Sequence, residues 1–171
     1  MTEVDHLRRI RFWLGLFIVG LVLSGVTAFP LQAESSSLVS LAHSGFLRPI
    51  VEFTGLGAWI ERVNEGLIAM NVRYPFLAYG TDWLAFAHLV IAVAFIGPFI
   101  DPVRNKWVIS FGLIACAGVI PRTLIAGPIR GIPILWRLID CSFGIEGSIP
   151  LLICRRSIIA LERGEGIIAK R

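Results

Sequence analysis

Three ionisable residues interrupt an apolar stretch that is long enough to cross a bilayer. Arg137, Asp140 and Glu146 lie between Ile132 and Arg156, where most other residues are apolar. An ionised group near the bilayer centre costs roughly 2.5 to 3.5 kcal/mol on insertion scales, so such residues normally face a protein interior or a wet cavity. The chemistry open to them is ion pairing, proton transfer or the binding of a small polar ligand.

Four polar side chains are expected at one level in the outer half of the membrane: His88, Arg122, Arg137 and Asp140. Arg137 and Asp140 are three residues apart and share a helix face. At 1.5 Å per residue, His88 and Arg137 lie about 8 Å below the outer ends of their spans, and Asp140 lies about 12 Å below. We expect a polar layer that either fixes the register of the helices or holds a small ligand.

Glu146 differs from this layer because no basic residue lies three or four positions away. Gly144, Gly147 and Pro150 surround it, and Pro150 cannot donate a backbone hydrogen bond to the carbonyl of Glu146. One interpretation is a locally unwound helix with Glu146 as a proton- or ion-coupling group, as at some transport sites. The other is a helix packed closely through its glycines, with Glu146 bonded to a neighbour's backbone.

A redox role is a further alternative. His88 is the one histidine inside an expected span, and with His43 from the outer loop it would ligate a haem. A quinone headgroup hydrogen-bonded by His88 and Asp140 is equally open. Catalytic motifs are absent: the chain has no glycine-rich phosphate loop, H-E-x-x-H, G-x-S-x-G or Cys/His metal spacing, so an enzyme is not favoured.

The composition predicts that these residues lie in a membrane protein, whose first partner is the lipid bilayer. The chain has 171 residues, 56% of them hydrophobic and 16% charged, with a mean hydropathy of +0.76. A soluble domain has about a quarter of its residues charged. The net charge of +4 does not indicate nucleic acid, because most Lys and Arg residues flank apolar runs.

Four apolar runs predict an all-α membrane protein with four transmembrane helices in a bundle and a single domain. Each approaches the roughly 20 residues that span a bilayer, and they cover residues 12–29, 83–100, 107–125 and 132–154. Pro121 is expected to kink or end the third. A cleaved signal peptide competes for the first run, but its length of about 18 residues favours retention as an anchor.

The remaining sequence divides into an outer loop and a short C-terminal segment. Residues 31–80 are mixed in polarity, and apolar residues recur at helical spacing from Leu56 to Ile68. We expect one or two short amphipathic helices there, at the headgroup level or capping the bundle. The residues after Arg156 are expected to form a short solvent-exposed helix or tail.

The distribution of positive charge predicts the orientation. With four spans, ten of the sixteen Lys and Arg residues fall on the side that holds both termini, and most of these lie directly beside apolar runs. Short cytoplasmic segments carry such an excess. Both termini are therefore expected in the cytoplasm.

Two segments carry a resemblance to known sequences. YPFLAYGTDWLAFAHLVIAVAFIGPFIDPVRN (Tyr74 to Asn105), and GLIACAGVIP with IAGPIRGIPILWRLIDCSFG (between Gly112 and Gly144), resemble a family of small bacterial four-helix integral membrane proteins of uncharacterised activity. The likeness covers about half of the chain. It implies a bacterial inner membrane and no particular activity.

These observations lead to one expected function with two alternatives. The first is a non-enzymatic accessory or small-ligand-binding subunit, acting as a homo-oligomer or in a larger membrane complex. The alternatives are a haem- or quinone-linked redox component that uses His88, and an oligomeric transporter or channel that uses Glu146.

Overall fold

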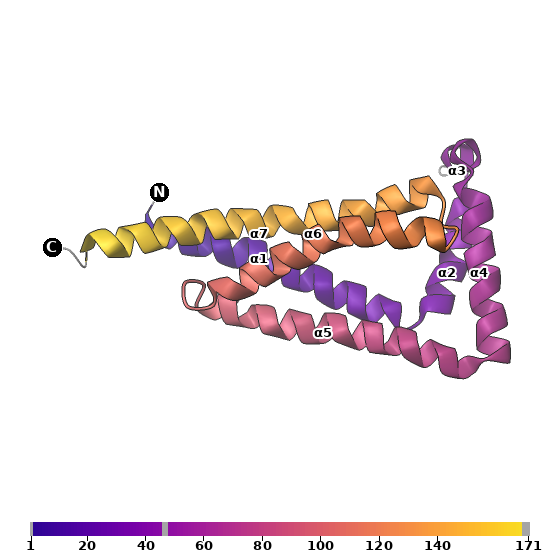
Figure 1. Ribbon diagram of the computed structural model, residues 1–171, viewed down its shortest axis with the longest axis horizontal. Helices are drawn as coiled ribbons and strands as arrows, with labels where there is room; N and C mark the ends of the chain where they lie inside the picture. Colours follow the sequence, from indigo (N-terminus) through magenta and orange to yellow (C-terminus); the bar gives the residue numbers. More distant parts are fainter. Residues whose placement is uncertain (1, 46–47, 169–171) are drawn as a thin grey trace.

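The computed structural model, which describes residues 2–45 and 48–168, is helical and has no strand in these residues. In the described residues four long helices lie side by side, and three shorter ones form a layer across one of their ends (Figure 1). The helices and one 3-10 turn follow one another as α1 (Glu3–Ala28), α2 (Leu31–Ala42), α3 (Arg48–Thr54), α4 (Leu56–Arg73), η1 (Pro75–Leu77), α5 (Ala78–Ile100), α6 (Lys106–Ile129) and α7 (Ile134–Ile168).

The long helices form two antiparallel pairs. α1 packs along α5, and α6 packs along α7, while contact between α1 and α7 joins the pairs. The start of α1 and the last turns of α7 lie at the same end of the molecule, which we call the terminal end (Figure 1). The α2–α4 layer lies across the opposite end, which we call the layer end.

Three helical segments of the described chain are long and apolar enough to cross a membrane, which indicates a membrane protein. They are Glu3–Ala28, Pro75–Ile100 and Lys106–Ile129. α7 is not among them, since Arg137, Asp140 and Glu146 interrupt its first half and Arg155 and Arg156 follow soon after.

Two helices continue where the sequence suggested a break. α6 runs past Pro121 and Pro128 to Ile129, and α7 runs through Glu146 and Pro150. Proline removes one backbone hydrogen bond, but helices in membranes tolerate it because neighbouring groups satisfy the freed carbonyl. α7 is therefore not unwound beside Glu146.

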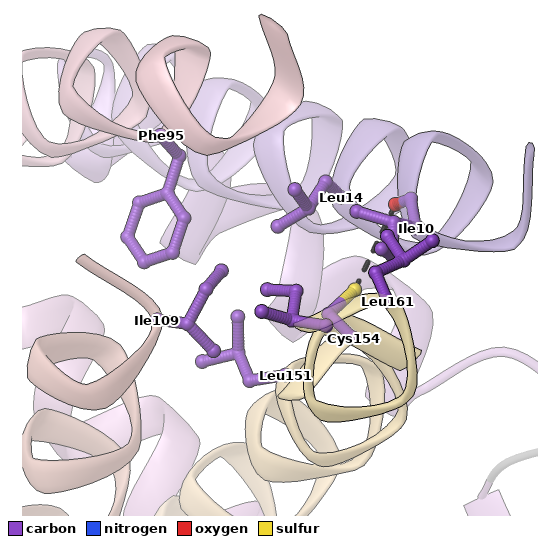
Figure 2. Close-up of a cluster of buried hydrophobic side chains, with 8 residues drawn as sticks. Ile10, Leu14, Phe95, Ile109, Leu151, Cys154 and Leu161 are labelled. Atoms are coloured by element: carbon purple, nitrogen blue, oxygen red, sulfur yellow. Dashed lines mark hydrogen bonds between the residues drawn. The ribbon is translucent and has the colours of Figure 1, made fainter. Parts of the chain in front are cut away.

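The large buried side chains gather near the terminal end. Phe95, Ile109 and Leu151 meet between the two helix pairs, and Cys154 donates a weak hydrogen bond through its Sγ to the carbonyl of Ile10 at 3.7 Å (Figure 2). Aliphatic and aromatic side chains of this size supply most of the packing contacts in a core. This cluster, which we call the terminal core, holds the two pairs together.

Residues 157–162, which follow Arg156, belong to this core. Ile158 and Leu161 are 2% and 6% exposed, and Lys106 Nζ pairs with Glu162 Oε1 at 2.6 Å. This corrects the expectation of a solvent-exposed segment there. Ile158 and Leu161 are three residues apart and lie on one face of α7, so the buried face of this helix continues past Arg155 and Arg156.

Toward the layer end, the contacts within each pair are made by small residues. A Cβ added to Gly25 of α1 would lie 3.0 Å from the carbonyl oxygen of Ala85 in α5, and one added to Gly144 of α7 would lie 2.6 Å from the carbonyl oxygen of Cys116 in α6. Small residues let membrane helices approach closely. Each pair is therefore close-packed through its backbone.

The stretch expected to hold one or two short helices contains three in its described residues, 31–45 and 48–80. α2 and α4 are joined by polar contacts along their length: Asn71 Nδ2 donates to Gln32 Oε1 at 2.5 Å, and the Ser36 hydroxyl lies 3.1 Å from Asn64 Oδ1. Gly55, with a φ of 69°, turns the chain between α3 and α4, a backbone conformation that favours glycine.

Candidate functional site

Three of the four residues of the expected polar layer lie on the α6–α7 pair. Arg122 lies close enough to Asp140 to act on it electrostatically. At 1.5 Å per residue, Arg122 lies about 10 Å from the end of α6 at Ile129. Asp140 lies about 9 Å from the start of α7 at Ile134, so the two residues are at a similar level. No ion pair among the described residues joins Asp140 to Arg122 or to Arg137.

The Arg137 side chain lies across Gly127 of α6. A Cβ at Gly127 would overlap the Cγ and Cδ atoms of Arg137, so the absence of a side chain makes room for the arginine stem. The Nε of Arg137 is buried without a hydrogen-bond partner, and so is the hydroxyl of Thr123, one turn from Gly127 on α6. The sequence analysis missed Thr123, since a single threonine in an apolar helix carries no distinctive signal.

We expect Gly127→Ala to displace the Arg137 stem and lower the free energy of unfolding by about 1 to 2 kcal/mol, the usual cost of overpacking. Arg137→Ala removes the side chain that the new methyl group meets. The double variant should therefore lose about 1 kcal/mol less stability than the sum of the losses in the two single variants. Thermal unfolding of the four proteins in detergent measures this coupling, and strictly additive losses would contradict the contact.

His88 lies on the other helix pair. It belongs to α5, which packs along α1, and its Nδ1 hydrogen-bonds the carbonyl of Leu84 at 2.8 Å. No hydrogen bond or ion pair of the described residues links it to Arg137 or Asp140. The structure thus brings together the α6–α7 members of the layer but not its histidine.

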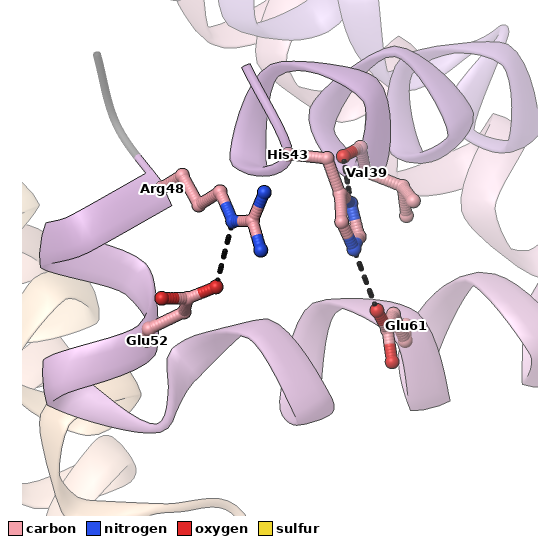
Figure 3. Close-up of polar contacts among 5 residues, drawn as sticks. All are labelled: Val39, His43, Arg48, Glu52 and Glu61. Atoms are coloured by element: carbon pink, nitrogen blue, oxygen red, sulfur yellow. Dashed lines mark hydrogen bonds and ion pairs between the residues drawn. The ribbon is translucent and has the colours of Figure 1, made fainter. Parts of the chain in front are cut away.

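His43 is committed to the contact between α2 and α4 (Figure 3). Its Nε2 lies 3.0 Å from Glu61 Oε1, and its Nδ1 lies 2.8 Å from the carbonyl of Val39. Both ring nitrogens are therefore engaged, and neither is left to coordinate iron. The residues present do not fit a haem held by His43 and His88.

A second ion pair lies close to His43, in the same α2–α4 layer (Figure 3). Arg48 and Glu52 pair at 2.8 Å within α3, and hydrogen bonding to Glu52 raises the pKa of the Arg48 guanidinium (Figure 3). Both side chains are about two-thirds exposed, so the pair adds little to stability. It orders α3 locally and offers no site.

Glu146 faces away from the helices that pack on α7. The residue is exposed, and no ion pair of the described residues involves it. Its helical neighbours Phe143, Ile145 and Ile149 are also exposed, at 64%, 57% and 48%. We call the surface formed by these four residues the α7 face. On it, one carboxylate is surrounded by apolar side chains.

No protein-family model matches the chain, and neither a curated protein nor a solved structure matches it. The functional argument therefore rests on the geometry of the helices. That geometry offers a set of polar side chains between α6 and α7 with no ion pair among the described residues, and an unpaired carboxylate on the α7 face.

Proposed function

We propose that α7 is a fourth membrane span and that both termini lie in the cytoplasm of a bacterial cell, in its inner membrane. α7 lies along α6 and α1, two of the three apolar candidate spans, and returns to the end at which α1 begins (Figure 1). If α1, α5, α6 and α7 all cross the membrane, the number of crossings is even, and the two ends of the chain lie on the same side. Of the fourteen Lys and Arg residues that the structure describes, eight then lie on the terminal side, as the positive-inside rule expects.

Within this topology, the protein is a non-enzymatic accessory subunit that associates with another membrane protein through the α7 face. The observation that carries the proposal is the exposed carboxylate of Glu146, about 18 Å below the outer end of α7 at 1.5 Å per residue. An unpaired charge facing lipid at this depth is unfavourable by a few kcal/mol. A partner helix that supplies a basic side chain offsets this cost through the attraction between the two charges.

The backbone beside Glu146 adds a second acceptor. Pro150 has no N–H to donate to the carbonyl of Glu146, so that oxygen lacks the usual helical donor. Charge complementarity therefore defines the partner as a membrane-spanning helix with Lys, Arg or His at the level of Glu146. Phe143, Ile145 and Ile149 supply the apolar contact around that pair.

The test uses the full chain in its own membrane, with a photo-crosslinking amino acid at Ile149. We expect a crosslink to a transmembrane segment that contains a basic residue, and no such product when the probe replaces Val93, which is 64% exposed on α5. Glu146→Gln should weaken the association about tenfold, or about 1.4 kcal/mol, because the amide keeps the shape but loses the charge. Glu146→Lys should abolish it.

The decisive arm is a charge reversal. Glu146→Lys combined with an acidic residue at the crosslinked basic position should restore the complex. A crosslink to a second copy of this chain, or a complex that survives Glu146→Lys, would overturn the proposal. The first of these outcomes would instead support the oligomeric transporter, in which Glu146 lines a path between copies.

A further inference from the structure

The terminal end carries five exposed arginines on two neighbouring helices, which we call the arginine cluster. Its members are Arg8, Arg9 and Arg11 of α1 and Arg155 and Arg156 of α7. No ion pair of the described residues involves any of them. Both groups directly adjoin apolar sequence, since α1 continues into an uncharged run from Phe12 and α7 reaches its arginines through Leu151 to Cys154.

A contact between the two helices brings both groups of arginines to one level. Cys154 Sγ donates to the carbonyl oxygen of Ile10 at 3.7 Å, and both residues are fully buried (Figure 2). Arg9 and Arg11 are the sequence neighbours of Ile10, and Arg155 directly follows Cys154. Because each residue adds 1.5 Å along a helix, the backbone of every arginine in the cluster lies within about 3 Å of the level of this contact. Two helices thus contribute cations to one place.

The acidic residues of this end do not cancel the charge of the cluster. Among the described residues, eight basic and five acidic ones lie at the terminal end. Asp5 Oδ2 accepts hydrogen bonds from the backbone N–H and the hydroxyl of Thr2, at 2.9 and 2.8 Å, and Glu162 is paired with Lys106. The cluster therefore keeps a positive charge that an external anion can balance.

The chemistry and the position of the cluster favour a lipid phosphate as that anion. Guanidinium groups bind phosphate oxygens through paired N–H donors. Basic residues directly beside membrane-spanning segments, or between two of them, recognise anionic lipid head groups. A free phosphate ion would leave the adjoining apolar runs unused, whereas a lipid whose head lies at the cluster places its acyl chains along them.

We propose that the arginine cluster binds the phosphate of an anionic phospholipid whose acyl chains lie along α1 and α7. Exposed apolar side chains are available for these chains, at Phe12 and Leu16 of α1 and Leu152 of α7. A zwitterionic head is poorly matched, because its ammonium group adds a positive charge to the cluster. The site requires α7 to be embedded beside α1, as proposed above, but it uses no residue of the α7 face.

Native mass spectrometry of the detergent-purified full chain tests the site, with dioleoyl phosphatidylglycerol as the probe. We expect one bound lipid, held about tenfold more tightly than dioleoyl phosphatidylcholine. Arg155→Gln combined with Arg156→Gln should weaken the binding of dioleoyl phosphatidylglycerol about tenfold, because two of the five cations are removed. Arg9→Gln combined with Arg11→Gln should have a similar effect, because both helices contribute to the site.

The matched control removes the same charge elsewhere. Arg62 and Arg73 are exposed on α4, at the layer end, and Arg62→Gln combined with Arg73→Gln should leave lipid binding unchanged. Circular dichroism of each variant verifies the fold, and if one double variant of the cluster is misfolded, the other carries the test. Full binding by a folded double variant of either helix would overturn the site, and so would equal weakening by the α4 control.

Further ligands separate the possible sources of the anion. Equal binding of dioleoyl phosphatidylcholine would overturn the requirement for a negative head. Glycerol 3-phosphate that bound as tightly as dioleoyl phosphatidylglycerol would overturn the lipid in favour of a free phosphate, and polyglutamate that did so would overturn it in favour of an acidic protein. Failure of the crosslink at Ile149 would leave these expectations unchanged, so the two proposals are tested separately.

Discussion

Replacing Gly144 with valine is expected to reduce the free energy of unfolding by about 3 kcal/mol, at the upper end of overpacking effects. A Cβ at this position would lie 2.6 Å from the backbone oxygen of Cys116 and 3.2 Å from the Cβ of Val119. A flexible side chain can move aside, but a backbone carbonyl moves only with its helix. α6 and α7 must therefore separate.

The measurement is thermal unfolding in detergent followed by circular dichroism. A loss of about 3 kcal/mol corresponds to a fall in Tm of roughly 6 to 12 °C for a chain of this size. Gly118→Val is the matched control, because a Cβ at Gly118 of α6 meets nothing within 4 Å. Equal Tm values for the two variants would contradict the close approach at Gly144.

The second large effect is expected from Leu151→Ala in the terminal core. Leu151 is fully buried and contacts the position of Gly112, beside Phe95. Truncating a buried leucine leaves a cavity and typically costs about 2 to 5 kcal/mol. Since this core joins the two helix pairs, the loss should appear in the unfolding of the whole molecule.

The adjacent residue supplies the control. Leu152 is 43% exposed, and Leu152→Ala makes the same chemical change with the same helix propensity, so its cost should stay below about 1 kcal/mol. Because the chemical change is the same, the difference in the loss of stability between the two variants measures the contribution of packing at Leu151. If both lost equal stability, the terminal core would not have the packing described.

The long helices were predictable because a bilayer imposes a length of about 20 apolar residues on a span. The expected runs at 12–29, 83–100 and 107–125 each fall largely within one helix, and the helices extend further because the backbone remains hydrogen-bonded into the adjoining polar residues. The continuation of α6 past Pro121 was not predictable from proline alone. Whether the helix continues past this proline depends on the packing of α6 against α7.

The polar residues were harder to place, because depth along a helix does not determine which helices are neighbours. His88 has a depth similar to that of Arg137, yet α5 pairs with α1 while α7 pairs with α6. The partners of α7 are decided by small residues such as Gly127 and Gly144, whose role is visible only once the opposing backbone is known. The cavity between the end of α1, α2, α4 and the start of α5 is lined by separate segments of the chain, so no local motif predicts it.

The terminal core gives the molecule a gradient of local stability. Large side chains interlock near the terminal end, whereas the closest contacts at Gly25 and Gly144 are made within a pair. Local opening requires the least free energy where few large contacts are lost. Amide hydrogens of the long helices should therefore exchange slowest around Leu151 and progressively faster toward the α2–α4 layer, so that the two pairs behave as arms hinged at the terminal end.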